Sequence, residues 1–403
     1  MADKSFLTWP FFDDSHRALA RDLEAWCERE LPNFHFDEAS LDATCRTFAL
    51  KLGQAGWLRY AVPKRFAGPA TTPGDDKLDV RSICIIRETI ARYSGLGEFI
   101  FAMQGLGSCP VTQFGSEKLK SKYLPSVAQG KSIAAFAISE AAAGSDISAM
   151  ATTARKSGNG YVIDGEKTWI SNGGIASHYV VFCRLPEMGE KSFVALMVDA
   201  DNPGLSISER IKIIAPHPLA TLRFKNCKAT EDAVIGKPGD GIRIAHATLD
   251  VFRPTVGAAA LGLARRALDD SITHCGQRSL FGQKLSDFQI TQAKLADMAT
   301  SIDASALLVY RAAWARDHGV ERITREAAMA KLFSTEAAQR TIDDAVQLFG
   351  SRGVVAGETM ERLYREVRAL RIYEGASEVQ KLIIAAQLLK PVKQAGALQG
   401  SHD

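Results

Sequence analysis

The chain has 403 residues, enough for two or three domains with sizeable hydrophobic cores. Hydrophobic residues make up 46% and charged residues 24%, which is typical of a globular protein and excludes a disordered or fibrous chain. Lys plus Arg number 49 against 46 for Asp plus Glu, a net charge of +3. This small and dispersed charge does not support a polyanion such as nucleic acid as a partner.

The sequence shows no sign of export or membrane insertion. The longest uncharged stretch of note, residues 99–116, contains glutamines, glycines and Pro110, which excludes a transmembrane helix there. The N-terminal residues lack the features of a signal or transit peptide. The seven scattered cysteines indicate a reducing compartment rather than a disulfide framework. These features predict a soluble cytoplasmic protein.

The N-terminal region has helical periodicity. Leu23 and Cys27 fall on one face of a first helix, and a second helix ends before Gly56. Residues 58–63 then predict an extended link, which leads to residues 64–69.

The pattern changes after Lys131, where β-forming residues become frequent. An Asp164–Gly165 pair separates residues 161–163 from residues 167–170 and predicts a hairpin, because both central residues of its turn need positive φ. Further β-rich segments follow at 179–183, 193–198 and 221–224. The middle region therefore predicts a sheet or small barrel.

The helical period returns from Asp240 onward. One apolar stripe on a long helix comprises Phe288, Leu295, Met298, Ile302 and Val309. A similar stripe on the last helix comprises Val379, Leu382, Ile383, Ala386 and Leu389. The pattern is lost after Lys390, which predicts a loose tail.

The predicted fold class is α+β and mainly α. We expect an N-terminal helical domain over 1–131, a middle β-sheet or barrel domain over 132–239, a C-terminal helical bundle over 240–390 and a tail over 391–403. No internal repeat alters this division.

Several common catalytic and binding motifs are absent from the sequence. Gly130-Lys131-Ser132 ends like a phosphate-binding loop, but Pro125 stands where the first glycine of that loop is needed. No G-x-G-x-x-G motif follows a predicted strand, and no G-x-S-x-G motif occurs. The eight histidines never pair at i, i+4, so we predict no metal site.

Residues 135–146 form the first of three unusual stretches. An apolar strand runs into a turn of small residues that contains Ser139, Glu140, Ser145 and Asp146. Glycine and hydroxyl groups of this kind let a backbone approach a ligand closely and hold its oxygens. A plain capped loop is the alternative interpretation.

Arg278 and Phe281 form the second unusual stretch, near the end of a long predicted helix. Residues three apart share a helix face, so this pair would present a forked cation beside an aromatic ring. Such a pair suits a pyrophosphate with a stacked ring, and a solvated arginine beside a core phenylalanine is the alternative.

Glu374 is the centre of the third unusual stretch, residues 371–378, just before the last helix. Its carboxylate is either a charge that stabilises the start of the helix or a general base whose pKa is raised by an apolar pocket. The pattern alone leaves both interpretations open.

Taken together and in this order, the three stretches resemble the acyl-CoA dehydrogenase flavoprotein family over about residues 15–390. The matching segments are 52–63, 136–146, 167–173, 278–298, 347–350 and 373–375. The family fold of helices, sheet and helices agrees with the periodicity.

The resemblance implies the reaction and the base. The family oxidises an acyl-CoA thioester to the 2,3-enoyl-CoA, with Glu374 matching the base that removes the α-proton and the N5 atom of FAD taking the hydride. Some relatives carry the base immediately before the arginine that matches Arg253. That position is Phe252 here, which cannot accept a proton, so the assignment returns to Glu374.

The resemblance also implies the cofactor and substrate residues. Those that match FAD-binding positions are Phe136, Ile138, Ser139, Trp169, Ser171, Arg278, Phe281, Gln289, Gln347, Gly350 and Ser377. Those that match substrate-side positions are Ser145, Arg253 and Gly375. Electron-transfer flavoprotein is the implied electron acceptor, and a homotetramer built as a dimer of dimers is the implied assembly.

Three places depart from the family pattern. Ala376 and Glu378 replace a common Thr and Gln, and residues 215–219, which include His217, stand where the family often carries an Arg and a Ser or Thr. His217 is either a polar group near the site or a structural histidine between prolines. Residues 98–103, at the expected wall of the acyl pocket, lack an arginine, which predicts a non-dicarboxylic acyl group that is short, branched or cyclic.

Two alternative functions remain on the same fold. A flavin oxidase or monooxygenase would react with oxygen, and a catalytically silent protein would only bind acyl-CoA or flavin. Retention of Glu374 disfavours the monooxygenase, whereas Ala376 and Glu378 favour the silent protein.

Overall fold

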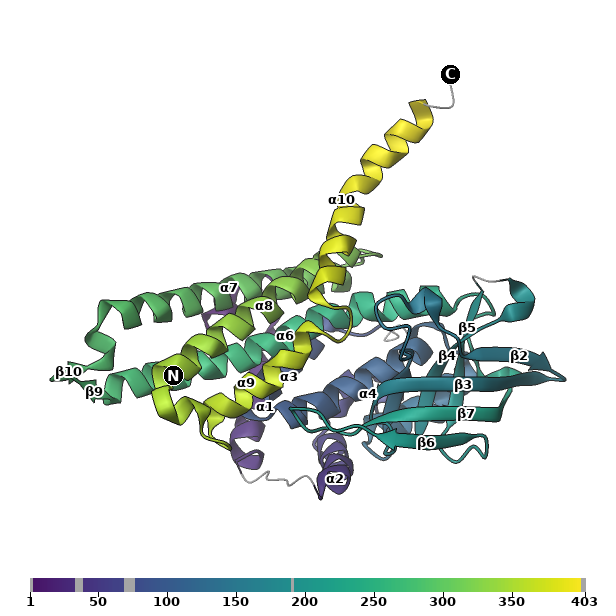
Figure 1. Ribbon diagram of the computed structural model, residues 1–403, viewed down its shortest axis with the longest axis horizontal. Helices are drawn as coiled ribbons and strands as arrows, with labels where there is room; N and C mark the ends of the chain where they lie inside the picture. The colour runs from purple at the N-terminus through teal and green to yellow at the C-terminus, as the bar shows by residue number, and fades with distance from the viewer. Residues whose placement is uncertain (1–2, 33–38, 69–76, 190–191, 400–403) are drawn as a thin grey trace. The chain divides into compact units, whose positions relative to one another are not determined.

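A computed structural model describes residues 3–32, 39–68, 77–189 and 192–399 (Figure 1). Its contacts divide the chain into two compact units. The helical unit comprises Met1–Trp26, Val80–Tyr93 and Asp250–Asp403, and the β unit comprises Cys27–Asp79 and Ser94–Leu249. The three-domain division expected from the sequence remains a prediction.

The β unit is built on an eight-stranded sheet. Seven strands follow the order β6-β7-β3-β2-β4-β5-β8, and β1 pairs in parallel with β4 (Figure 1). The strands are β1 (Ala134–Ala137), β2 (Thr153–Ser157), β3 (Gly160–Ser171), β4 (His178–Arg184), β5 (Phe193–Asp199), β6 (Leu205–Arg210), β7 (Leu219–Thr230) and β8 (Val234–Ile235). The helices of this unit include α2 (Leu41–Gln54), α4 (Gly95–Phe114) and α5 (Glu117–Ala128). The strands β4 and β5 are buried along almost their whole length, which explains their continuous apolar sequence.

The predicted hairpin at Asp164–Gly165 is wrong. β3 runs unbroken through this pair, and its hairpin with β2 closes earlier, between Ser157 and Gly160. The pair instead marks a bulge against β7, where Gly165 has a φ of 144°. A Cβ atom at Gly165 would lie 2.7 Å from the Thr152 Cα atom, so the glycine permits a close approach of backbone rather than a turn.

The two helices predicted near the N-terminus are confirmed as α1 (Asp14–Glu30) and α2. The extended link predicted over 58–63 is wrong, because its first residues belong to a 3-10 helix, Trp57–Tyr60. That turn buries Trp57 and Leu58, which is the physical reason for its compact form. Pro69, the last residue of the segment 64–69 that follows the predicted link, lies outside the described residues.

The helical unit contains most of the long helices. They are α3 (Val80–Tyr93), α6 (Gly241–Gln277), α7 (Gln289–Asp317), α8 (Thr324–Phe349), α9 (Thr359–Arg368) and α10 (Ser377–Gln399), with α1 and α6 continuing into the β unit. A short hairpin of β9 (Ser279–Leu280) and β10 (Gln283–Lys284) follows α6. The apolar stripe predicted on α7 is confirmed for Met298, Ile302 and Val309, which are buried. Other 3-10 helices span Ser5–Thr8, Lys64–Phe66, Ile147–Ala149, Pro186–Met188, Glu231–Ala233, Leu285–Asp287, Gly350–Val354 and Ala369–Arg371.

A buried polar cluster ties α3 to α6 and α7. Glu88 on α3 pairs with Arg265 on α6 at 2.7 Å and accepts a hydrogen bond from the Tyr310 hydroxyl on α7 at 2.5 Å. All three side chains are buried. Because a charge is tolerated in a protein interior only when it is paired, this cluster specifies the packing of α3 against the C-terminal helices.

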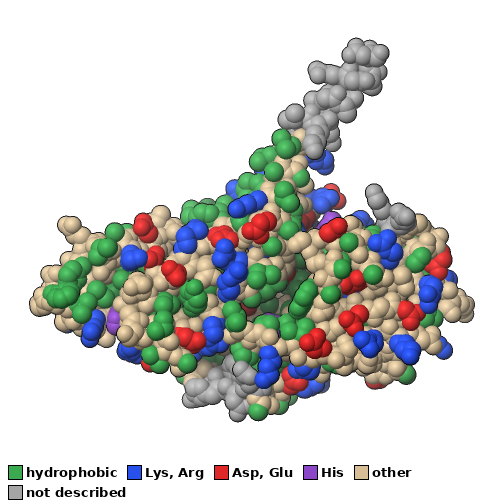
Figure 2. All heavy atoms as spheres, in the orientation of Figure 1, with side chains coloured by type: hydrophobic (Ala, Val, Ile, Leu, Met, Phe, Trp, Pro, Cys, Tyr) green, Lys and Arg blue, Asp and Glu red, His purple; other side chains and the backbone are tan. Residues whose placement is uncertain are grey.

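Helix α10 extends further than the sequence pattern predicts. It continues to Gln399, through most of the segment expected to be a loose tail, and residues 400–403 lie outside the described part. Its apolar stripe is largely exposed, with Leu382 at 70% and Leu389 at 50% exposure, and Figure 2 shows hydrophobic side chains on the part of this helix that is coloured by residue type. None of the helices in the described residues is long and apolar enough to span a membrane.

Candidate active site

The ends of β1 and β3 lie side by side in the β unit and carry residues predicted to hold the flavin ring. The Thr168 amide donates to the Ser139 carbonyl at 3.0 Å. Lys167 Nζ donates to the Ile138 carbonyl, also at 3.0 Å. These two bonds bring Ile138 and Ser139 beside the part of β3 that contains Trp169.

Trp169 interrupts the regular pairing of β3. It has a φ of 54°, lies at a register shift between Lys167 and Ile170, and is 51% exposed. A left-handed backbone costs a bulky residue roughly 1–2 kcal/mol, so this bulge presents the indole at a cost that core packing does not explain. Ser171, two residues further on, is half-buried, whereas Phe136 is buried within β1.

Glu140, one of the two acids of the 135–146 stretch, forms hydrogen bonds that hold this loop in place. The Glu140 carboxylate accepts hydrogen bonds from the Ala151 amide at 2.6 Å, the Thr152 amide at 2.9 Å and Lys167 Nζ at 2.8 Å. Burial by itself would raise the pKa of Glu140, but Lys167 and the backbone donors outweigh it and lower the pKa. Ser145, by contrast, is exposed on the turn, and its predicted role toward the substrate remains a prediction.

The second predicted cofactor region lies in the helical unit. Phe281 is at the tip of the β9–β10 hairpin with a φ of 49° and 94% exposure, and Arg278 is exposed at the end of α6. The His274 and Phe349 rings stack with centroids 4.2 Å apart, which places the end of α6 beside the end of α8. The other predicted residues of this region, all exposed, are Gln289, Gln347 and Gly350.

Glu374 lies in a left-handed turn immediately before α10. Its φ is 54° and that of Gly375 is 97°. Three side chains hold the carbonyls of this turn. Arg253 Nε donates to the Glu374 carbonyl at 3.2 Å, Lys331 Nζ donates to the Gly375 carbonyl at 2.7 Å, and Gln380 Nε2 donates to both carbonyls at 3.3 and 2.9 Å.

The two cations beneath this turn are both desolvated. Arg253 is 5% exposed and Lys331 is fully buried. Burial lowers the pKa of Lys331 to about 8, with Arg253 acting in the same direction and Glu374 opposing it. Burial likewise lowers the pKa of Arg253, opposed by Asp250 and Glu374. The structure thus holds Arg253, predicted for the substrate side, against the turn that carries the predicted base.

Helix α8 anchors both sides of the turn through Glu336. The Glu336 carboxylate accepts hydrogen bonds from Arg371 Nε at 2.8 Å and from the Ser377 hydroxyl at 2.5 Å. Burial would raise the pKa of Glu336, but these partners lower it. The hydroxyl of Ser377 therefore serves the fold, and its predicted role toward the cofactor remains a prediction.

Glu378 and Phe252, which bear on the assignment of the base, have ordinary structural surroundings. Glu378 is exposed in the first turn of α10, where a negative charge is favourable. Phe252 is fully buried in α6, as befits an apolar side chain. Neither observation disturbs the assignment of Glu374.

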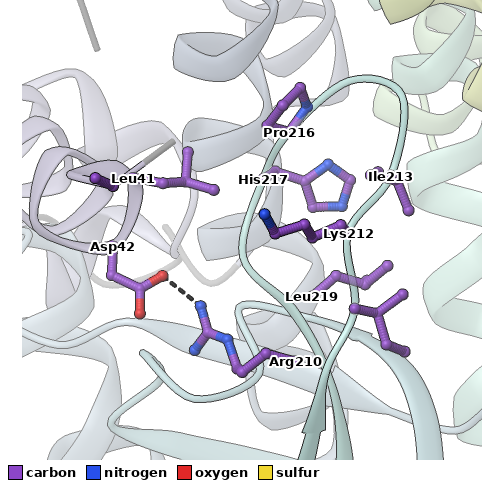
Figure 3. A pocket seen from close by; sticks show the side chains of 10 residues that line it. Leu41, Asp42, Arg210, Lys212, Ile213, Pro216, His217 and Leu219 are labelled. Carbon is purple, nitrogen blue, oxygen red and sulfur yellow. Dashed lines mark hydrogen bonds and ion pairs between the residues drawn. The ribbon is translucent and has the colours of Figure 1, made fainter. Parts of the chain in front are cut away.

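A separate pocket of about 370 Å³ lies in the β unit between α2 and the segment that joins β6 to β7 (Figure 3). Arg210 crosses it to Asp42 and also donates to the Gly173 carbonyl at 3.0 Å. His217 lines the pocket and stacks on Phe99 with ring centroids 4.1 Å apart. Burial lowers the pKa of His217 to about 4, so at neutral pH it is an uncharged ring in a packed position, as in the structural interpretation.

The sequence interpretation missed Lys331, Gln380 and the Glu140–Lys167 pair. A signal existed for Lys331, because it occupies the buried face of an alanine-rich helix beside Ala327 and Ala328. A lysine on such a face needs a specific partner. Within the described residues, no group of three or more His, Cys, Asp or Glu side chains is placed to hold a metal ion.

Comparison with known families covers nearly the whole chain. The N-terminal domain model of acyl-CoA dehydrogenase matches residues 13–131, the middle domain model matches 135–227 and the C-terminal domain model matches 239–389. The fold, with helices on either side of a β-rich middle in the sequence, agrees with these matches. The chain belongs to the acyl-CoA dehydrogenase family, and it is an oxidoreductase.

Individual relatives match over similar lengths. The probable acyl-CoA dehydrogenase FadE25 of Mycobacterium tuberculosis is 34% identical, over 94% of this chain and 98% of its own. The 3-(aryl)acrylate reductase of Clostridium sporogenes is 35% identical, over 94% of this chain and 100% of its own. The structure of an acyl-CoA dehydrogenase from Bacillus anthracis, complexed with FAD, has a TM-score of 0.86 and 30% identity, over 98% of this chain and 72% of its own.

The residues of the β1–β3 edge fit a flavin on their own chemistry. Trp169 offers an exposed aromatic plane at a strained bulge, and Ser139 and Ser171 offer hydroxyl groups on the same edge. A tricyclic ring with polar atoms along one side needs both kinds of contact. The exposed Arg278 and Phe281 offer a cation and a ring for an anionic, aromatic group.

Proposed function

We propose that this chain catalyses FAD-dependent α,β-dehydrogenation of an acyl-CoA thioester to the 2,3-enoyl-CoA, with Glu374 as the base for the α-proton. The observation that carries the proposal is the left-handed backbone of Glu374, a residue type that rarely adopts a φ of 54°. Such a conformation persists only where the surroundings impose it, and Arg253, Lys331 and Gln380 do so here. Strain maintained by three buried donors indicates a functional rather than an architectural residue.

The proposed chemistry needs a positioned base because a C–H bond beside a thioester carbonyl is only weakly acidic. A carboxylate at hydrogen-bond distance contributes about 10²- to 10⁴-fold by general base catalysis. The carbonyl oxygen must also receive hydrogen bonds as enolate charge develops, and the backbone N–H of Glu374 is the donor we assign from this chain.

FAD is the cofactor, and when bound it supplies at N5 the acceptor for the hydride that leaves the β-carbon. Ser139, Trp169 and Ser171 are the residues that would hold its ring, and Arg278 and Phe281 would hold its diphosphate and adenine end. Each of these assignments uses exposed or half-buried groups with the required chemistry.

The acyl group is proposed to be non-dicarboxylic, and short, branched or cyclic. Helix α4, which contains the predicted wall of the acyl pocket, has neither Lys nor Arg. Relatives of similar identity act on different compounds according to their names, so aryl substrates belong in the test.

We also propose a homotetramer and electron-transfer flavoprotein as the electron acceptor. The exposed Leu382, Leu388 and Leu389 of α10 support association with other copies, because exposed large apolar side chains along one helix mark an interaction surface. Sedimentation velocity measures the assembly, and reduction of purified electron-transfer flavoprotein measures the acceptor.

The test is an anaerobic titration of the purified flavoprotein with acyl-CoA thioesters, followed by the absorbance of oxidised flavin. The panel contains straight, branched, cyclic, aryl and dicarboxylic acyl groups. We expect bleaching by one non-dicarboxylic class and a loss of about 10³-fold or more in bleaching rate for Glu374→Gln, which keeps the shape but cannot accept the proton.

Other outcomes identify the alternatives. A yellow protein that none of the thioesters bleaches indicates the monooxygenase or the silent binding protein. Full activity of the Glu374→Gln variant contradicts the proposed mechanism. Bleaching by dicarboxylic thioesters alone contradicts the proposed substrate class.

A further inference from the structure

Three side chains donate hydrogen bonds to the carbonyls of the Glu374 turn, and Lys331 is the one that α8 carries. Its side chain is fully buried. Its Nζ atom donates to the Gly375 carbonyl at 2.7 Å, the shortest of the bonds from these donors. Arg253 and Gln380 complete the support at 2.9–3.3 Å. Lys331 and Arg253 are charged donors, which make stronger bonds to a carbonyl than a neutral donor does, and the shorter bond of Lys331 makes it the principal tether of the turn.

The tether is rigid because α8 holds the same segment at two further points. Glu336, five residues along the helix, accepts hydrogen bonds from Arg371 before the turn and from Ser377 after it. The backbone between these points has little freedom to move relative to Lys331. The ammonium group therefore has a defined place next to Glu374.

The charges that face Lys331 come from four elements. Glu374 lies on the turn itself, Arg253 on α6, Glu336 on α8 and Glu378 on α10. Asp250, also on α6, faces Arg253 at 3.8 Å. Glu374 and Lys331 favour each other's charged forms, so the ionisation of one depends on that of the other.

From this geometry we infer that Lys331 is a positioning residue for the base: its ammonium group fixes the Glu374–Gly375 turn and, through its charge, keeps Glu374 ionised at neutral pH. This inference rests on the proposed function. Burial lowers the pKa of Lys331 to about 8, so its own charge is lost above that pH.

Two substitutions separate the bond from the charge. Lys331→Met keeps an unbranched chain but removes both the donor and the charge, and Lys331→Gln keeps a donor without the charge. Lys381→Met is the matched control, because Lys381 is an exposed lysine on α10. Far-UV circular dichroism and gel filtration establish that each variant is folded and assembled before rates are compared.

The experiment measures the rate of anaerobic flavin bleaching by the best thioester between pH 5 and 10. Removing a neighbouring cation raises the pKa of a carboxylate, so in Lys331→Met the acid limb of the profile should move up by roughly one pH unit. The rate at pH 7 should fall about 10- to 100-fold because the base is no longer held in place. Lys331→Gln should recover part of the rate but keep the displaced limb, and Lys381→Met should match the wild type.

A second readout does not depend on turnover. Proton exchange at the α-carbon of a bound thioester that has no β-hydrogen to transfer, measured in ²H₂O by mass spectrometry on the holoenzyme, should show the same displaced acid limb in Lys331→Met. A loss of rate with an unmoved acid limb in both assays would overturn the inference and leave Lys331 as a packing residue. A wild-type protein that neither bleaches nor exchanges its thioester would instead refute the proposed function, and the inference with it.

Discussion

Two fully buried lysines, Lys167 in the β unit and Lys331 in the helical unit, have opposite kinds of partner. Lys167 bonds to the Glu140 carboxylate at 2.8 Å as well as to the Ile138 carbonyl. The hydrogen bond of Lys331 is to the Gly375 carbonyl, and the carboxylates of Glu374, Glu336 and Glu378 act on it without such a bond in the described contacts.

The Glu140–Lys167 pair is a structural ion pair, whereas Lys331 is a buried charge that we expect to titrate near neutral pH. Burial lowers the pKa of both lysines, and at Lys167 the bonded Glu140 carboxylate opposes this shift. The Glu140–Lys167 pair holds a loop in one conformation. Lys331, whose bond is to a carbonyl, has a pKa of about 8. The first arrangement suits a scaffold for a cofactor, and the second suits the support of a general base.

The largest effect is expected from breaking the structural pair. Glu140→Gln leaves Lys167 buried opposite a neutral amide and should cost about 3–5 kcal/mol of unfolding free energy. Urea unfolding of the protein, followed by circular dichroism, measures it. In the double variant Glu140→Gln with Lys167→Met the loss should be smaller than the sum of the single losses. Additive losses would show that the two side chains do not act as a pair.

The pH dependence of stability tests the charge of Lys331. The native pKa of Lys331, about 8, is below its ordinary value of 10.5, so the unfolded chain binds more protons between these values. Wild type should therefore gain stability relative to Lys331→Met as pH rises through this window, by up to about 3 kcal/mol. Isothermal urea unfolding at pH 7.5, 8.5 and 9.5 measures the difference. A constant difference across the three values would show that Lys331 titrates normally.

Gly375→Ala strains the turn without touching a charge. Gly375 has a φ of 97°, and a Cβ atom there would overlap Gln380 Nε2. We expect a loss of about 2 kcal/mol in stability and a slower bleaching rate with an unmoved acid limb. Gly189→Ala is the matched control, since Gly189 also has a positive φ of 102° but nothing within 4 Å of its Cβ position. Equal effects in the two variants on bleaching rate would contradict a special role for the turn.

The smallest effect is expected from loss of the hydrogen bond between Ser377 and Glu336, next to the Glu374 turn. Ser377→Ala removes one hydrogen bond to Glu336, which keeps its bond to Arg371, and should cost about 1 kcal/mol. Thermal unfolding measures the loss. Retention of flavin, measured by absorbance after gel filtration, tests the separate prediction that Ser377 binds the cofactor. Unchanged retention would refute that role.

Local pattern was enough to predict most of the helices and the β-rich middle, and it failed where two segments meet. The stripe of Met298, Ile302 and Val309 predicted α7 because helical periodicity is a property of neighbouring residues. The interpretation of the Asp164–Gly165 pair as a turn is wrong because its glycine permits the approach of Thr152, which immediately precedes β2. Glycine occurs both in tight turns and where two backbone segments pack closely, and only the contacts in the structure distinguish the two cases.

The sequence by itself determined the class of fold and the family and predicted the base, because periodicity and each matching motif are properties of residues close together along the chain. Only the tertiary structure decided what surrounds that base. The base and the residues around it come from separate elements: Arg253 lies on α6, Lys331 on α8 and Glu374 before α10. The sequence does not show that the partners of Arg253 and Lys331 are backbone carbonyls, because every residue has one. A buried charge is interpretable only through the groups that surround it, because those groups set both the cost of burial and the pKa.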